Sequence, residues 1–368
     1  MTTSHDVVVV GGGPVGAACA RELARAGRRV LLLEPGGESG QAWLAAAGML
    51  APQIEARHED PLLELGLAAR EHYRPLADEL LDRTGVDIGL WQEGIAAVAA
   101  DEAEAAELWS RVAWQRQQGL LSDWLDAEEV ATRWPWLGPS RGALWAAHEG
   151  ALEPGKLVRA LLDDARMAGA ELVQNRAIAI ESRGERFAAV AGERDRYPAG
   201  DAVIAAGAWS PLIEGLPRPL SVAPVRGQMA AVPWPAGARR AIIYGRDCYL
   251  VARGDEAILG STMEYVGFRS EVTSAGLGRM FAGAAALCPS LDPAGVRRTW
   301  SGLRPMTPDG LPIIGAEPRM QGLWYATGHG RNGILLAGLT GLLMKQLLAG
   351  EPPAEDLAPF SPARFWTW

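Results

Sequence analysis

Three glycines close to the N-terminus have the spacing of a dinucleotide-binding turn. They form Gly11-x-Gly13-x-x-Gly16, between a run of valines and an alanine-rich segment. In such a turn the first glycine allows the sharp change of direction, the second lets a pyrophosphate approach the backbone, and the third lets a helix pack closely on a strand. The N-terminus of that helix offers free N–H groups and partial positive charge to phosphates. The spacing therefore predicts a dinucleotide site.

The segments that flank these glycines form the unit that must position them. Residues 6–10 and 29–33 are predicted as apolar strands, and residues 17–26 as the helix between them. Strand, turn, helix and strand make a parallel βαβ unit. Glu34 ends the second strand, 18 residues after Gly16. Its carboxylate can accept hydrogen bonds from ribose hydroxyls and would repel a 2′-phosphate, so an NADP-type ligand is disfavoured.

A second glycine loop lies near the C-terminus and runs Gly328-His329-Gly330-Arg331-Asn332-Gly333. It follows a predicted strand at residues 323–327 and opens a predicted helix at residues 334–348. No apolar strand with a terminal acid comes after that helix, so the βαβ unit is incomplete. We therefore do not expect a second dinucleotide. We expect this loop to direct N–H groups and a helix dipole at one polar part of a ligand.

A third motif occupies residues 301–315 and reads SGLRPMTPDGLPIIG. Together with the two glycine motifs, in this order, it resembles the D-amino-acid oxidase superfamily of FAD-dependent amine oxidases. Residues 45–50 (AAAGML) and the RNGILLAG stretch look like the glycine oxidases of thiamine biosynthesis, and residues 205–210 (AAGAWS) also fit. The resemblance covers essentially the whole chain.

The resemblance implies an α/β fold (α+β overall) with a Rossmann-like FAD-binding domain interleaved with a mixed β-rich substrate-binding domain. Short strands separated by turn residues at 221–260 fit the second domain, and no break in composition separates two consecutive domains. We predict residues 1–83, 139–220 and 303–368 for the FAD-binding domain. Residues 84–138 and 221–302 are predicted for the substrate-binding domain.

Three side chains match the family's substrate site, and we assign them as catalytic. Arg304 matches a guanidinium that pairs with the substrate carboxylate, for which a bidentate guanidinium is the best partner. Tyr249 matches a tyrosine whose hydroxyl helps to hold that carboxylate; the alternative is an ordinary strand tyrosine. Arg331 matches a position near the flavin and the substrate amine; the alternative is an arginine that anchors its loop.

The resemblance also implies non-covalent FAD, because residues 302–307 hold no cysteine to which a flavin could be attached. Met49 and Met263 match positions on the face of the flavin ring, although a methionine more often fills a core. The five histidines lack metal-ligand spacing, so no metal is expected. The residues assigned to the cofactor are Gly11, Gly13, Pro14, Val15, Gly16, Glu34, Pro35, Ala46, Ala47, Gly48, Met49, Ile178, Gly207, His329, Gly330, Arg331, Asn332, Gly333, Ile334 and Leu335.

The family's reaction is hydride transfer from the substrate α-carbon to the flavin, followed by hydrolysis of the imine and reoxidation by oxygen with release of peroxide. Such chemistry asks the protein for orientation and electrostatics, and the sequence offers no obvious acid–base dyad. The helix after Gly333 is expected to stabilise the negative charge of the reduced flavin. We expect oxidative deamination of glycine or other small amines and D-amino acids, with a role in thiamine (thiazole) biosynthesis.

One position departs from the family and leaves the substrate preference open. The glycine oxidases that the chain most resembles tend to carry His two residues before the tyrosine, where this chain has Asp247. A carboxylate there would repel the substrate carboxylate unless it pairs with Arg246 or is turned away.

Other functions are weighed against this one. A D-amino-acid dehydrogenase, which passes electrons to a quinone or another acceptor, shares the GLRPMTPDG run, and a sarcosine or proline oxidase would use the same chemistry. A non-catalytic FAD-bearing subunit would need neither Arg304 nor Tyr249. An NAD dehydrogenase would need neither the Arg304 motif nor the second glycine loop.

Composition and charge argue against some classes of binding partner. The formal net charge is −9 and the basic residues are scattered, which argues against a nucleic-acid or membrane surface. Three cysteines without CxxC spacing fit a reducing compartment, and from the N-terminal residues we expect no signal peptide. The apolar stretch at 334–348 is shorter than a membrane span. We expect a cytoplasmic protein that meets a small substrate and molecular oxygen, with homo-oligomerisation left open.

Overall fold

The valine-rich run near the N-terminus forms the middle of a sheet of eight strands in the computed structural model, which describes residues 5–37, 39–291 and 294–365. The strands of this first sheet are β1 (His5–Val10), β2 (Val30–Leu33), β8 (Glu171–Val173), β9 (Ala177–Arg183), β10 (Arg186–Gly192), β11 (Arg196–Ile204), β17 (Ile313–Ala316) and β18 (Leu323–Thr327). Their order is β17-β18-β11-β1-β2-β8, and β10 and β9 extend from β11. The pairs from β18 to β8 are parallel, and β17, β10 and β9 are antiparallel additions.

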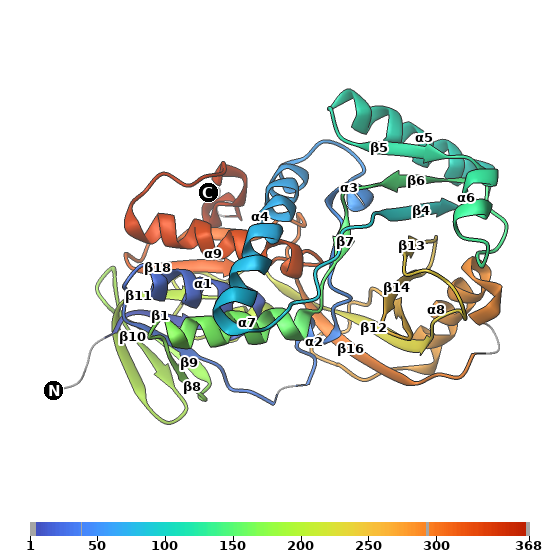
Figure 1. The fold of residues 1–368 in the computed structure, drawn as a ribbon. Helices are drawn as coiled ribbons and strands as arrows, with labels where there is room; N and C mark the ends of the chain where they lie inside the picture. Colours follow the sequence, from blue (N-terminus) through green and yellow to red (C-terminus); the bar gives the residue numbers. More distant parts are fainter. Residues whose placement is uncertain (1–4, 38, 292–293, 366–368) are drawn as a thin grey trace.

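Both faces of the first sheet are covered. Helices α1 (Pro14–Arg25), α7 (Pro154–Met167) and α9 (Gly333–Ala349) pack on one face, with α4 (Pro61–Thr84) against them (Figure 1). Successive residues of a strand point to opposite faces. Val7 and Val9 therefore join the core under these helices, whereas Val8 and Val10 join the core on the side of β9 and β10. Burial on both faces explains why β1 and β2 read as continuous apolar runs.

The first glycine turn has the close contacts that its sequence predicts. A Cβ atom on Gly16 would lie 1.9 Å from the carbonyl oxygen of Gly11, so only glycine lets α1 start this close to the end of β1. Pro14 occupies the first turn of α1, where a missing N–H costs nothing. No side chain caps this helix at Gly13, so its N-terminal N–H groups face the turn without a side-chain partner.

A second sheet of eight strands lies beside the first (Figure 1). Its strands, in spatial order, are β16 (Arg298–Met306), β12 (Ala223–Pro233), β15 (Glu256–Gly260), β14 (Tyr249–Arg253), β13 (Ile242–Tyr244), β4 (Ile95–Ala99), β6 (Gly142–Ala146) and β5 (Ser122–Leu125). All neighbouring pairs are antiparallel except β13 with β4. Helices α5 (Glu102–Gln117), α6 (Ala127–Arg133) and α8 (Ser274–Leu287) pack against this sheet.

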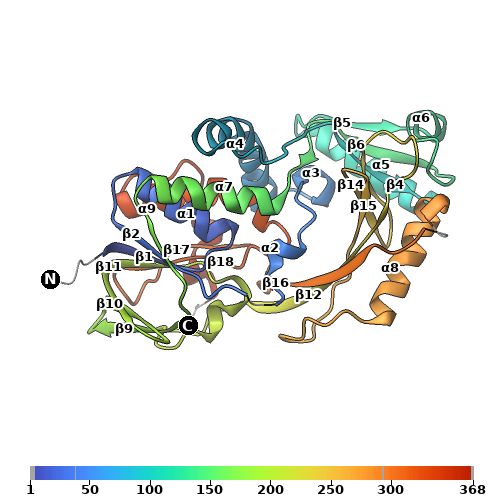
Figure 2. The ribbon, with the colours of Figure 1, turned by 60° about the horizontal axis from the view of Figure 1, so that its bottom comes forward.

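Strands β12 and β16 bring the second sheet to the first. They pair over nine consecutive positions, and Figure 2 shows them reaching toward the middle of the molecule. The amide of Leu303 on β16 donates to the carbonyl of Gly40 at 2.8 Å, which fastens the strand to the segment after β2. The remaining short elements are α2 (Ala42–Ala45), β3 (Met49–Leu50), α3 (Pro52–Glu55), β7 (Gly150–Ala151), and the 3-10 turns η1 (Gly207–Leu212), η2 (Pro289–Leu291), η3 (Ala358–Phe360) and η4 (Pro362–Phe365).

The architecture confirms the predicted mixed α/β fold class. The helices predicted at 17–26 and 334–348 are present as α1 (Pro14–Arg25) and α9 (Gly333–Ala349). The domain bounds remain a proposal. The sequence prediction gave residues 139–220, and with them strand β6, to the first domain. We place β6 with the second domain, because it pairs with β4 and β5 of the second sheet. Residues 1–4, 38 and 366–368 of the predicted first domain and 292–293 of the second lie outside the described residues. Within the described part of the chain, no helix is both long and apolar enough to cross a membrane.

A buried network of ion pairs joins three helices above the first sheet. Arg21 of α1 is 2% exposed, and its Nε donates to Oδ2 of the fully buried Asp164 of α7 at 2.6 Å. Arg83 of α4 donates to the other oxygen of Asp164 at 2.5 Å, and Glu79 of α4 pairs with Arg21. Because each buried charge depends on its partners, the network ties α1, α4 and α7 to one arrangement.

Removing one partner of this network should destabilise the fold strongly. We expect Asp164→Ala to lower the free energy of unfolding by about 3 kcal/mol, because the buried Arg21 and its neighbour Arg83 both lose their fully buried carboxylate partner, and Glu79 alone cannot replace it for both. Asp163→Ala is the matched control, since this neighbouring side chain is only half-buried and pairs with Arg159 and Arg166 on the helix surface; its cost should stay below about 1 kcal/mol. Urea unfolding measures both. Equal losses would contradict this account of the network.

Candidate active site

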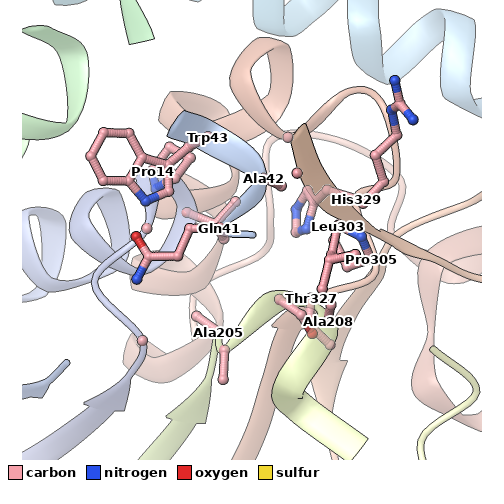
Figure 3. Close-up of a pocket in the computed structure, with 18 of the residues that line it drawn as sticks. Pro14, Gln41, Ala42, Trp43, Ala205, Ala208, Leu303, Pro305, Thr327 and His329 are labelled. Carbon is pink, nitrogen blue, oxygen red and sulfur yellow. Dashed lines mark hydrogen bonds between the residues drawn. The ribbon is translucent and has the colours of Figure 1, made fainter. Parts of the chain in front are cut away.

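A cavity of about 450 Å³ opens where four parallel strands of the first sheet end. Val10, Leu33, Ala205 and Thr327 line it at or just after the ends of β1, β2, β11 and β18. In parallel α/β sheets, ligands bind at this carboxyl edge. In Figure 3, Pro14, Gln41 and Trp43 form one side of the cavity, and residues of β16 and the second glycine loop form the other.

Most of the predicted site residues line this cavity. The predicted residues that line the cavity are Gly11, Gly13, Pro14, Val15, Glu34, Pro35, Ala46, Ala47, Met49, Ile178, Gly207, Tyr249, Arg304, His329, Gly330, Arg331, Asn332, Gly333 and Ile334. Besides Met263, which is described below, three predicted residues do not line it, for physical reasons. Gly16 packs against Gly11, Gly48 lies where a Cβ would be 2.0 Å from the carbonyl oxygen of Leu152, and Leu335 belongs to the core under α9.

The carboxylate of Glu34 is held in place by three donors. Oε2 accepts from the amide of Gly12 at 2.7 Å, and Oε1 accepts from the amide of Gly36 at 3.1 Å and from Nε2 of Gln41 at 3.0 Å. Carboxylate oxygens have further lone pairs, which ribose hydroxyls can use. Gln41 is a site residue that sequence reasoning missed. It carries no motif, and only the fold of the segment before α2 brings it to Glu34.

Two helix N-termini face the cavity without side-chain caps. Gly13 precedes α1 and Asn332 precedes α9, and neither helix has a side chain that accepts from its first amides. Both residues line the cavity. Uncapped N–H groups and the helix dipole favour a ligand with negative charge at each of these points.

Arg304 enters the cavity from β16 without a carboxylate partner among the described residues. Its Nη1 donates to the carbonyl of Thr262 at 3.1 Å and its Nη2 to Oγ of Ser261 at 2.6 Å. Burial lowers the pKa of Arg304, which is still a strong base and charged at neutral pH. Both of its recorded acceptors are neutral, so the positive charge is available to an anion in the cavity.

Glycine on the neighbouring strand makes room for this guanidinium. A Cβ on Gly227 of β12 would lie 2.3 Å from both terminal nitrogens of Arg304. The side chain therefore lies flat across the backbone of β12. Tyr249 of β14 is buried beside it, and its hydroxyl contacts Sδ of Met229 at 3.5 Å. Burial raises the pKa of Tyr249, so the phenol keeps its proton and can donate a hydrogen bond.

Arg331 differs from Arg304 because a carboxylate already neutralises it. Its Nη2 donates to Oε1 of Glu55 at 2.9 Å, and the hydroxyl of Tyr244 donates to the same oxygen at 3.0 Å. The charge of Glu55 is the largest cause of the raised pKa of Arg331. Glu55 ends the short helix α3, where no sequence motif marks it. An anion in the cavity is therefore attracted mainly by Arg304.

A second cavity of about 600 Å³ adjoins the first. Glu55, Tyr249, Ser261 and Arg331 line both cavities and so form the wall between them. Met263, expected on the face of a flavin ring, lines this second cavity instead and is 45% exposed.

Asp247, the departure from the family pattern, also lines the second cavity. It is exposed there. Arg246 does not pair with it but with Asp101 and Glu104. Asp247 is not among the residues of the cavity that Arg304 enters, so its carboxylate is turned away from that guanidinium's cavity.

His329 of the second glycine loop is buried and neutral. Its Nε2 lies 3.1 Å from Oγ1 of Thr340 on α9. Burial alone lowers the pKa of His329 to about 3. A neutral imidazole at neutral pH gives this side chain a packing and hydrogen-bonding role in the cavity wall, not that of a proton donor with a matched pKa.

Comparison with known proteins gives one family over nearly the whole chain. Residues 6–347 match the family described as FAD dependent oxidoreductase. Glycine oxidase from Geobacillus kaustophilus is 37% identical, over 99% of this chain and 98% of its own length. The bifunctional protein ThiO/ThiG from Synechocystis is 33% identical over 100% of this chain and 55% of its own length. The crystal structure of the Geobacillus enzyme superposes with a TM-score of 0.94 at 36% identity, covering 99% of both chains.

A methyl group at position 227 should disturb the anion site without disturbing the fold elsewhere. Gly227→Ala would push the guanidinium of Arg304 from β12, and we expect the affinity for acetate to fall about tenfold or more. Equilibrium dialysis with radiolabelled acetate measures it. Gly278→Ala is the control, because a Cβ there meets nothing within 4 Å. Unchanged acetate affinity in Gly227→Ala would contradict this placement of Arg304.

Acidification should destabilise the protein through His329. The unfolded side chain takes up a proton below its ordinary pKa of 6.5, whereas the folded one does so only near 3. The contribution of His329 to the free energy of unfolding is therefore fully present above pH 6.5. It is lost as the pH falls from 6.5 toward 3, by about 1.4 kcal/mol per pH unit. His329→Gln, which can keep a contact with Thr340, should flatten this slope between pH 6.5 and 5. Parallel melting-temperature curves for the two proteins would show that His329 is not the group responsible.

Proposed function

We propose that this chain, which belongs to the family of FAD-dependent oxidoreductases, oxidises glycine and other small amines and amino acids that carry a carboxylate. The products are the oxo acid, ammonia or an amine, and hydrogen peroxide. The observation that carries the proposal is Arg304, an available guanidinium in the same cavity as the dinucleotide turn. A carboxylate is the group that such a fork binds best.

The residues of the cavity fit FAD. The uncapped N-terminus of α1 suits the pyrophosphate, Glu34 suits ribose hydroxyls, and the uncapped N-terminus of α9 suits the negative charge of a reduced ring. Residues 302–307 contain no cysteine, so we propose non-covalent attachment. Bound FAD supplies the acceptor for the hydride of the substrate α-carbon, and molecular oxygen is the proposed final acceptor.

The chain's own task in this reaction is orientation. Arg304 holds one end of the substrate by its carboxylate, and the protonated hydroxyl of Tyr249 donates a second hydrogen bond to it. A substrate held at two points presents its α-carbon in one direction, which replaces a search in solution by a fixed geometry. No separate general base is needed in this account, in keeping with the neutral His329 and the paired Glu55.

For Arg331 we propose that the side chain anchors its own glycine loop and does not contact the substrate. Its pair with Glu55 holds the second glycine loop, at the start of α9, against α3, at the wall between the two cavities. Glu55 already compensates the charge of Arg331, so this arginine attracts a substrate carboxylate less strongly than Arg304 does.

The biological setting is proposed by likeness. The glycine oxidase relative and the joined ThiO/ThiG protein favour a role in thiamine (thiazole) biosynthesis. The three cysteines are free and buried, which fits a reducing compartment, and we propose the cytoplasm.

Peroxide release in air tests the function. We expect turnover with glycine, sarcosine, D-alanine or D-proline. Flavin that is bleached by an amine with little peroxide would replace the oxidase by a dehydrogenase with another acceptor. Absence of any bleaching with all four amines would contradict the proposal.

Arg304→Ala should raise the Michaelis constant at least tenfold, the equivalent of about 1.5–3 kcal/mol for one charge-assisted contact. Arg196→Ala is the control, because this arginine pairs with Glu181 at the surface of the first sheet. Steady-state constants give both values. Unchanged constants for Arg304→Ala would remove this residue from the substrate site.

A further inference from the structure

A serine just after β15 holds the guanidinium on which the substrate site depends. Of the two acceptors recorded for Arg304, the carbonyl of Thr262 is backbone and any residue at that position supplies it. The other acceptor, Oγ of Ser261 at 2.6 Å, exists only if residue 261 has a hydroxyl. Nothing in the sequence motifs marks Ser261.

The same serine also touches the second group of the carboxylate site. A side-chain hydrogen bond with Ser261 is one of the contacts that lower the pKa of Tyr249, against the larger effect of burial. Ser261, Tyr249 and Arg304 all line the first cavity. One hydroxyl therefore lies between the guanidinium and the phenol that face the substrate.

The backbone that carries Ser261 is fixed to the second sheet. The amide of Gln228 donates to Oγ1 of Thr262 at 2.9 Å. Arg226 and Glu264 exchange two backbone hydrogen bonds, at 2.9 and 3.0 Å, and Nε of Arg226 donates to the Glu264 carboxylate at 2.8 Å. Ser261 is thus a rigid support and not part of a free loop.

We propose that Ser261 is a positioning residue of the carboxylate site, acting through Arg304. Its hydroxyl accepts one N–H of the guanidinium and so fixes the plane of the fork, which leaves the remaining N–H groups facing the cavity. Without it a single backbone carbonyl holds the fork, and each binding event must order the side chain anew. This proposal rests on the function proposed above, because it takes a carboxylate as the ligand.

Acetate binding to the FAD-loaded enzyme tests the positioning role of Ser261. The change in flavin absorbance on titration with acetate gives the Kd. We expect Ser261→Ala to raise the Kd of acetate about five- to tenfold. The Michaelis constant for glycine should rise by the same factor, with kcat within about twofold, because the reacting atoms are untouched. Ser270→Ala is the matched control in the same segment, since its hydroxyl contacts Oγ of Ser39 at 3.3 Å and not Arg304.

A double-mutant cycle separates positioning from a general structural effect. If Ser261 acts through Arg304, then Ser261→Ala changes the acetate Kd less than about twofold in the Arg304→Ala background. Two results would overturn the proposal while leaving the proposed function intact. One is a five- to tenfold rise in the acetate Kd when Ser261→Ala is added to Arg304→Ala. The other is an unchanged Kd in Ser261→Ala alone. Failure of the wild-type enzyme to bind acetate or to oxidise glycine would overturn both.

Discussion

Burying a guanidinium that has no carboxylate partner costs free energy, because the charge loses part of its hydration. Many residues of the substrate site offset this cost for Arg304. Two neutral oxygens accept from it, and glycine at position 227 lets it lie against a neighbouring strand. Arg331, a second cation in the cavity wall, is already neutralised by Glu55. Among the residues that the structure describes, Arg304 is thus a positive charge without a carboxylate partner beside the carboxyl edge of the first sheet, where an anion lowers the electrostatic free energy of the whole site.

The second organising feature is that the N-termini of two helices face the same cavity and both favour negative charge there. Helices α1 and α9 come from opposite ends of the chain, yet both begin at the wall of one cavity and both lack side-chain caps. They also pack on each other above the first sheet. The buried charges of Arg21 and Asp164 hold α1 against its other neighbours, so the phosphate-facing end of that helix is positioned by interactions far from any ligand.

Local spacing made the cofactor side of the site predictable. The turn at Gly11, the acid at Glu34 and the loop at Gly330 lie within a few residues of elements whose periodicity is plain in the sequence, and the cavity contains all three. The residues that were missed come from long-range contacts. Gln41 meets Glu34 through the fold of a connecting segment, and Glu55 meets an arginine 276 positions away. No local pattern encodes such a meeting, and for the same reason the domain limits around β6 do not follow from composition.

The pairing of β12 with β16 bears on the surroundings of the buried site. Nine paired positions join these two strands within the second sheet, and the bond from Leu303 to Gly40 joins β16 to the segment after β2. Backbone hydrogen bonds therefore hold in place the edge of the second sheet that lines the first cavity. The second cavity adjoins the first across Glu55, Tyr249, Ser261 and Arg331, which line both. A small molecule that moves from one cavity to the other must pass these residues. Tyr249 is buried and Glu55 is paired with Arg331, so this passage would require packed and ion-paired side chains to move.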